Sequence, residues 1–335
     1  MGAVQAQDYG GARWAVAQRS QGLTGADLDA ALAAGNVVRT HVLRPTWHLV
    51  SASDLRWLLA LTAPRVKTLA AYGNRQSGLD PATIAKSNRV IAAAVQGHQL
   101  TRAEMAAGLR RAGVLTPDAI GIGRLLLAAE LDGVICSGAV RGTQHTHALL
   151  DERVPPSAAK DRDTALADLS ARYFASHGPA TIKDFAWWSG LSVSDARRGA
   201  HAAQPPLESV DMGATTYWMP SGTGHPGSPP PPMAHLLPNF DEYTVGYSDR
   251  SLLIDGEDIQ RLSPRPDVIS NNVVVVNGRI VGTWRRQART HSIRLSLSLF
   301  SRPTKPHDVA ITEAVERYAA FVGQPVDLDR GYSDP

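Results

Sequence analysis

The sequence predicts an α+β fold in which small modules of helices and short β-ribbons precede a β-rich domain. Two observations carry this prediction. Through about residue 220, apolar residues recur at helical spacing, and each group of helices is followed by a pair of short strands. Beyond about residue 232 the apolar residues alternate with polar ones, which is typical of strands with one buried face. A chain of 335 residues has room for two or three domains.

The first module is expected over residues 1–80. A helix opens at Thr24 and closes at Gly35, where the chain needs a residue that tolerates positive φ. Two strands are predicted around Arg44-Pro45, over 37–43 and 46–50. Asp54 begins the next helix, and Pro64 is expected to break it.

The second module, residues 81–155, has the clearest local signals. Thr101 and Glu104 have the spacing of a capping box, in which each side chain satisfies an amide at the start of a helix. The order of helices followed by a hairpin is that of a winged helix, which places one helix in the DNA major groove and the hairpin across the backbone. The expected helices are 84–95, 102–112 and about 117–131, and the expected hairpin strands are 134–138 and 144–150.

The third module is expected over 156–232. It comprises a helix over 164–176, a helix capped by Thr181, a turn at Gly190, a helix begun by Ser192 and a ribbon that ends at Pro220. Trp187 and Trp188 are expected to pack in its core. Residues 221–232 are rich in proline and glycine, which favours a loop or linker.

Residues 233–335 are expected to form a small β-barrel with a C-terminal helix over 310–322. Asn277-Gly278 supplies the two positive φ angles of a type I′ turn, so the flanking residues predict a tight hairpin. Residues 292–300 alternate apolar and polar side chains and predict a half-buried strand.

Composition narrows the class of protein. Charged residues make up 19% and hydrophobic residues 43%, an ordinary globular balance, and no apolar run reaches the length of a membrane span. No signal peptide is visible, and the single Cys136 excludes an internal disulfide and disfavours structural zinc, so we expect a cytoplasmic protein. The first 150 residues hold 15 basic and 9 acidic side chains, against 19 and 22 in the rest. This asymmetry suits a polyanionic partner or is ordinary scatter.

Several segments together resemble one protein family, the winged-helix DNA glycosylases of the azinomycin-resistance (AlkZ-like, YcaQ-like) type. The resemblance implies three tandem winged helices and a small β-barrel, arranged as a C-shaped clamp around double-stranded DNA. It also implies a monomeric, cofactor-free and metal-free hydrolase that excises N7-alkylated purines, including bulky adducts and interstrand crosslinks, in DNA repair or self-resistance. The matching segments are 2–9, 43–49, 61–66, 150–155, 184–191, 237–243 and 278–284.

The resemblance assigns catalysis to Gln5 and Gln7, because Gln5-Ala6-Gln7 matches the family motif of glutamine, apolar residue, glutamine. A glutamine cannot take up a proton at neutral pH, but its carbonyl oxygen can orient a water and face a developing positive charge. Residues i and i+2 of an extended segment point the same way, so both amides can serve one site. Without the family, the two are a pair of surface amides. The family also carries a helix before this motif, which we expect is missing here.

DNA contacts are expected from basic and polar side chains on the ribbons and nearby loops. They are Arg44, Thr46 and His48 on the first ribbon, Arg65 and Lys67 after Pro64, His145 and His147 on the second ribbon, and Arg285, Arg286 and Arg289 in a basic stretch that reaches Arg294. The first-ribbon set and the basic stretch are also consistent with a solvated protein surface. For His145 and His147 the alternative is metal binding, which the lack of a nearby Cys or acidic third ligand disfavours. Asp8 and the pair Asp241-Glu242 are interpreted as structural. The alternative function is a non-catalytic winged-helix DNA-binding protein, either a regulator or an inactive relative.

Overall fold

The computed structural model of the chain describes residues 1–114, 118–222, 231–262 and 265–332. It divides into two compact units. The helical unit comprises Met1–Ala3 and Asp29–Ser221, and the sheet unit comprises Val4–Leu28 and Gly222–Pro335. Both helices and sheets are present throughout, which confirms the α+β class. Among the described helices, none is both long and apolar enough to cross a membrane.

The first group of elements follows the predicted order, with one correction in its long helix. Strands β2 and β3 pair antiparallel, with Thr40 opposite His48. Helix α3 continues through Pro64, so the predicted break is wrong. The apolar side of α3 stays packed on both sides of the proline, through Leu61 and Val66, and this packing offsets the lost backbone hydrogen bond. The elements are α2 (Gly25–Ala34), β2 (Val37–His41), β3 (Trp47–Ser51) and α3 (Ala52–Gln76).

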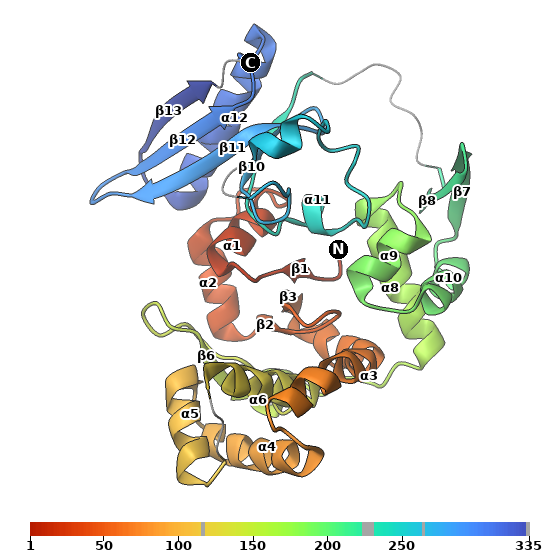
Figure 1. Cartoon of the computed structure of the whole chain (residues 1–335), viewed down its shortest axis with the longest axis vertical. Helices are drawn as coiled ribbons and strands as arrows, with labels where there is room; N and C mark the ends of the chain where they lie inside the picture. The colour runs from red at the N-terminus through yellow and green to blue at the C-terminus, as the bar shows by residue number, and fades with distance from the viewer. Residues whose placement is uncertain (115–117, 223–230, 263–264, 333–335) are drawn as a thin grey trace. The chain divides into compact units, whose positions relative to one another are not determined.

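The second group confirms the predicted helices and hairpin (Figure 1). Thr101 and Glu104 form the capping box at the start of α5. The expected start of the next helix, near residue 117, lies outside the described residues. Apolar side chains of α4, α5 and α6 share one core, in which Ile91, Leu109 and Leu125 are buried. The elements are α4 (Pro81–Val95), β4 (Leu100–Thr101), α5 (Arg102–Arg111), α6 (Ala119–Leu131), β5 (Ile135–Ser137), β6 (Thr146–Leu149) and α7 (Leu150–Arg153).

The third group also has its predicted caps, with Thr181 and Asp184 forming a capping box and Ser192 capping the following helix. Gly190 has φ +70°, and a Cβ there would collide with the carbonyl oxygen of Leu43, so only glycine fits this turn. Most of the expected linker, residues 223–230, lies outside the described residues. The elements are α8 (Arg162–His177), α9 (Ile182–Ser189), α10 (Val193–Ala202), β7 (Leu207–Met212) and β8 (Thr215–Pro220). That these three groups are winged helices forming a clamp stays a prediction.

The sheet unit is built on five strands in the order β13-β12-β11-β10-β9. The predicted hairpin is confirmed, since Asn277 and Gly278 have φ +50° and +81° between paired strands β10 and β11. The alternating burial of β12 confirms the half-buried strand. The elements are β1 (Val4–Gln5), α1 (Tyr9–Ala17), β9 (Ala234–Leu237), α11 (Glu242–Val245), the 3-10 helix η1 (Asp258–Arg261), β10 (Val273–Val276), β11 (Arg279–Ala288), β12 (Ile293–Leu299), α12 (Lys305–Val322) and β13 (Val326–Tyr332).

The expected barrel is wrong, because the described strands of this unit form an open sheet whose edges are β13 and β9. Strand β13 runs parallel to β12, so the chain between them must cross over one face of the sheet, and α12 makes that crossing (Figure 1). Ile311 and Tyr318 of α12 are buried against this face together with Trp14 of α1. The helix thus covers apolar side chains that closure into a barrel would otherwise have to bury.

Candidate functional site

The glutamine motif lies at the start of the sheet unit. Gln5 is buried, with 6% of its surface exposed, whereas Gln7 is exposed. Regular strand geometry covers only Val4–Gln5, and Asp8 caps α1 by accepting a hydrogen bond from the Gly11 amide at 3.2 Å. The motif is therefore held between a short strand and a helix start, and its two amides differ in exposure.

A buried carboxylate contacts the first glutamine. The backbone amide of Gln5 donates to Oε1 of Glu242 at 2.6 Å, and Glu242 is 1% exposed. Its neighbour Asp241 is equally buried and accepts two hydrogen bonds from the Arg19 guanidinium, at 3.0 and 2.6 Å. Burial works against the charge on Arg19, but the Asp241 carboxylate outweighs it and raises the pKa of Arg19. Asp241 and Glu242 thus tie the N-terminal segment to α11.

This link was missed by the sequence reasoning, which treated Asp241-Glu242 as structural and unconnected with Gln5. Gln5 and Glu242 are separated by 237 positions, and neither periodicity nor capping patterns carry information over that distance. The only sequence signal was that segments 2–9 and 237–243 both belong to the family resemblance.

On the first ribbon the predicted DNA-binding residues differ in accessibility. Arg44 and Thr46 are half-buried, and His48 is fully buried, with its ring Nδ1 2.9 Å from the Thr46 carbonyl oxygen. The Arg44 guanidinium lies 5.8 Å from the ring centre of Trp187, whose surface is 43% exposed. Trp188 packs in the core as expected, but the core prediction is wrong for Trp187.

Arg65 and Lys67 both lie on the exposed side of α3. Lys67 forms an ion pair with Asp132, at the end of α6. Arg65 lines a cavity of about 420 Å³ together with Arg162 and Asp195. Continuity of the helix through Pro64 places both cations on one rigid element rather than on a loop.

The two histidines of the second ribbon belong to a buried polar cluster. Glu130 of α6 is 1% exposed and accepts a hydrogen bond from the His41 backbone amide at 2.9 Å, and it pairs with the His41 ring. His147 approaches the same carboxylate at 3.7 Å. Burial and the nearby Arg39 charge lower the pKa of His145 to about 4. Burial also lowers the pKa of His147, against the opposing charge of Glu130.

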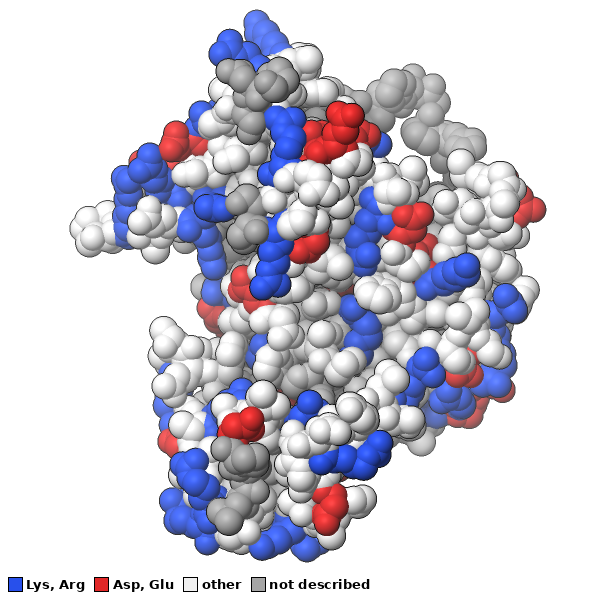
Figure 2. Space-filling model, in the orientation of Figure 1, with Lys and Arg blue, Asp and Glu red and all other residues white. Residues whose placement is uncertain are grey.

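The basic stretch covers the outer part of the β11–β12 hairpin, where Figure 2 shows Lys and Arg side chains gathered. Arg285, Arg286 and Arg289 are all exposed. Arg285 pairs across strands with Ser296 and lines a polar hollow of about 570 Å³ to which Arg261 and Arg294 also contribute. This face of the sheet is hydrophilic, whereas its opposite face packs on α12.

Sequence comparison places these features in a known family. The family model for AlkZ-like DNA glycosylases matches residues 1–321. The chain is 25% identical, over 338 aligned positions, to an interstrand DNA cross-link repair glycosylase of Streptomyces sahachiroi, covering 98% of this chain and 89% of the relative. The solved structure of the Streptomyces sahachiroi DNA glycosylase AlkZ is similar in fold, with a TM-score of 0.78, 23% identity, and coverage of 97% of this chain and 91% of that one. The chain therefore belongs to the AlkZ-like DNA glycosylase family.

Proposed function

We propose that this protein is a monofunctional DNA glycosylase that hydrolyses the N-glycosidic bond of N7-alkylated purines in double-stranded DNA. The observation that carries the proposal is the family match over residues 1–321, which includes Gln5, held by a buried carboxylate. The protein would act as a cytoplasmic monomer without a cofactor and leave an abasic site for base excision repair. Its role would be DNA repair or self-resistance.

The chemistry of two glutamines suits a base that is already cationic. N7 alkylation places a positive charge on the purine ring, so the base can leave without being protonated by the enzyme. What remains is to hold a water near C1′ and to stabilise an oxocarbenium-like transition state. The carbonyl oxygens of Gln5 and Gln7 can accept hydrogen bonds from that water and face the growing charge.

Glu242 supports this role of Gln5 in two ways. Its carboxylate accepts a hydrogen bond from the Gln5 backbone amide and so fixes the backbone of the motif. Because both residues are buried, water cannot replace the carboxylate as the acceptor. Its negative charge also favours a cation nearby. We therefore assign Glu242 as a positioning residue for Gln5.

For DNA binding we propose contacts from both units. Arg44, Arg65 and Lys67 are proposed to contact phosphate, and Trp187 beside Arg44 adds an exposed aromatic face. The Thr46 hydroxyl is buried, so the proposed part of Thr46 is to shape the ribbon. His48 and His147 are buried, so their part is to shape the ribbons. The remaining contacts are His145, Arg285, Arg286 and Arg289.

The proposed range of substrates is based on similarity to a named relative. The Streptomyces sahachiroi protein is named an interstrand DNA cross-link repair glycosylase, and the two chains align over 98% of this one. We propose that this protein likewise accepts bulky adducts and interstrand crosslinks. An open site that does not require base extrusion would admit such substrates, whereas a tight base-flipping pocket would exclude them.

The test is release of N7-methylguanine from duplex DNA, measured as abasic sites, for the parent protein and the double variant Gln5→Ala, Gln7→Ala. We expect release by the parent and a fall of about a hundredfold or more in the variant, since electrostatic groups at a reacting centre commonly contribute that much. Gln21→Ala, an exposed glutamine outside the motif, is the matched control and should keep full activity.

Equal release by the parent and the double variant would remove Gln5 and Gln7 from catalysis. Absence of release by the parent, together with retained duplex binding, would favour the alternative of a non-catalytic DNA-binding protein. A crosslinked duplex assayed in parallel tests the wider substrate range, because unhooking separates the two strands on a denaturing gel.

A further inference from the structure

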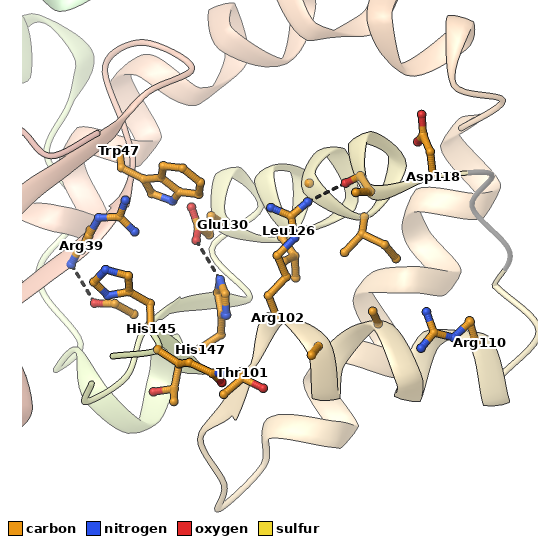
Figure 3. Close-up of a pocket in the computed structure, with 18 residues that line it drawn as sticks. Arg39, Trp47, Thr101, Arg102, Arg110, Asp118, Leu126, Glu130, His145 and His147 are labelled. Carbon is orange, nitrogen blue, oxygen red and sulfur yellow. Dashed lines mark hydrogen bonds and ion pairs between the residues drawn. The ribbon is translucent and has the colours of Figure 1, made fainter. Parts of the chain in front are cut away.

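A cavity of about 810 Å³ lies within the helical unit and takes no part in the proposed glycosylase chemistry (Figure 3). It is bounded by α5, α6 and strand β6, with Arg39 and Trp47 at its inner end. Its volume is in the range of sites that bind small molecules. The cavity shares His145 and His147 with the ribbon proposed to face DNA, and its other lining residues have no part in the proposed function.

The walls of this cavity consist of small side chains on two facing helices. Ala103 and Ala106 of α5 lie opposite Ala119 and Gly123 of α6. None of these side chains extends far enough to fill the space between the helices, and the larger apolar residues of α6 line the cavity beside them. We call the space between the two helices the slot; its lining is mainly apolar, which suits a ring system.

The mouth of the slot is electropositive. Arg102 and Arg110 line the cavity from the first and last turns of α5, and within the described part of the chain neither forms an ion pair. Arg102 donates to the Ala119 carbonyl oxygen at 2.5 Å, which holds it over the slot (Figure 3). Among the charged side chains over α4 and α5, Figure 2 shows more Lys and Arg than Asp and Glu. These cations favour a ligand with a negative charge.

The two carboxylates that line the cavity are already engaged. Asp118 caps α6 by accepting from the Gly121 amide at 2.8 Å, and Glu130 is held by the backbone amide and ring of His41. Glu130 is thus turned to His41, whereas Asp118 keeps its negative charge. The two cations Arg102 and Arg110 outnumber this one carboxylate, so the net charge of the three side chains is positive.

The inner end offers polar groups that can distinguish ring atoms. The Arg39 guanidinium lies over the Trp47 ring at 4.3 Å from its centre, and only 8% of Arg39 is exposed. His145 stays neutral at pH 7, because burial and the Arg39 charge lower its pKa to about 4. A neutral imidazole presents one donor and one acceptor. Together with the Ser137 hydroxyl, which accepts from the Arg39 amide at 2.7 Å and keeps its own proton to donate, it suits a ring that carries heteroatoms.

We propose that this cavity binds a planar aromatic anion, with its ring between α5 and α6 and its carboxylate or phosphate at Arg102 and Arg110. Two sources share this chemistry, namely nucleotides and small aromatic acids. Their common features are a flat ring system of one or two cycles and one anionic group, which is attached to the ring directly in an aromatic acid and through the sugar in a nucleotide.

The test is titration calorimetry of the full chain with three probes, which are dGMP, 2-naphthoate and the cation 2-naphthylmethylammonium. We expect one saturable site for at least one of the two anions, and binding of the cation at least tenfold weaker. Binding of dGMP alone identifies a nucleotide site, and binding of 2-naphthoate identifies an aromatic acid site. Absence of saturable binding by both anions, or equal binding of the cation, overturns the proposal.

Two substitutions locate the site, each with a matched control on the same helix. Ala103→Trp fills the slot and Arg110→Glu reverses a charge at its mouth, and each should weaken binding of the anion about tenfold or more. Ala112→Trp and Arg111→Glu are exposed and do not line the cavity, so they should bind within about twofold of the parent. Since all four positions are exposed, circular dichroism should show unchanged folding. Equal losses in the controls contradict the location.

Discussion

Each unit of the molecule holds buried carboxylates, but their partners differ. Glu130 of the helical unit contacts His41 and His147, and Asp241 of the sheet unit contacts Arg19. A guanidinium stays charged at every pH that a protein survives, whereas an imidazole can lose its charge near neutrality. Asp241, near the glutamine motif, therefore has a partner that is positively charged at all these pH values. The partners of Glu130, beside the cavity, are histidines, whose charge depends on pH. Burial of a carboxylate alone thus does not decide how a region responds to acid.

The largest effect is expected from Arg19→Met. It leaves the Asp241 carboxylate, whose side chain is fully buried, without its counter-charge. Loss of one partner from a buried pair costs about 3–5 kcal/mol. Urea denaturation at pH 7.5 measures the free energy of unfolding. Arg19→Lys, which keeps the charge but loses the two-pronged hydrogen bond, should cost less. A loss below about 1 kcal/mol in Arg19→Met would show that Asp241 does not depend on Arg19.

A smaller effect is expected from Glu130→Gln. The side-chain amide still accepts a hydrogen bond from the His41 backbone amide, and glutamine is neutral, so no buried carboxylate is left without a partner. We expect a loss of about 2 kcal/mol in the same urea experiment, the scale of hydrogen bonds to charged groups. Glu313→Gln, at an exposed position on α12, is the control. A loss larger than that of Arg19→Met would reverse the comparison.

Acid should destabilise the protein through the histidines of the helical unit. The pKa of His145 is about 4 in the folded protein and about 6.5 in an unfolded chain, and that of His147 is also lowered. Between these pH values the unfolded state binds more protons, so stability falls as pH drops from 6.5 to 4 and is unaffected by these groups above 6.5. Urea midpoints at several pH values should show the decline.

Two histidine variants test which unit causes the loss of stability at low pH. His145→Gln should flatten the profile between pH 6.5 and 4. His235→Gln removes a histidine of the sheet unit whose pKa is also lowered, by burial and by the Arg317 charge. A larger flattening in His235→Gln than in His145→Gln would place the acid sensitivity in the sheet unit.

The smallest effect is expected from Arg294→Ala. Arg294 pairs with Asp329 at 2.9 Å, but both side chains are about half exposed. Exposed pairs contribute about 0–1 kcal/mol and weaken with salt. Melting temperatures at low and high salt should therefore differ little between this variant and the parent. A loss comparable to that of Arg19→Met would show that burial is not what separates the two classes of ion pair.

The sequence predicts local structure well wherever a few neighbouring residues decide it. The capping boxes at Thr101 and Thr181 and the turn at Asn277-Gly278 form as expected, since each depends on residues at most three positions apart. Pro64 misleads because a proline removes only one hydrogen bond from a helix whose packed side compensates for it.

Features that join distant segments were not predicted. Alternation in β12 reveals a buried face but not what covers it, so helix α12 and the parallel strand β13 replaced the expected barrel. The contact of Gln5 with Glu242 and the clustering of His41, Glu130 and His147 have no signature in sequence spacing. The cavity likewise arises where small residues of α5 and α6 face each other, which only the tertiary structure decides.

The sheet unit is discontinuous in sequence, and this has a consequence for synthesis on the ribosome. Its first segment, Val4–Leu28, emerges before nearly all of the helical unit, yet Trp14 packs against Tyr318 with ring centres 5.1 Å apart. During translation Gln5 therefore lacks Glu242, and α1 lacks α12, until most of the chain has been made. A ribosome that stops before α11 releases a chain in which the backbone of Gln5 has no Glu242 carboxylate to bind.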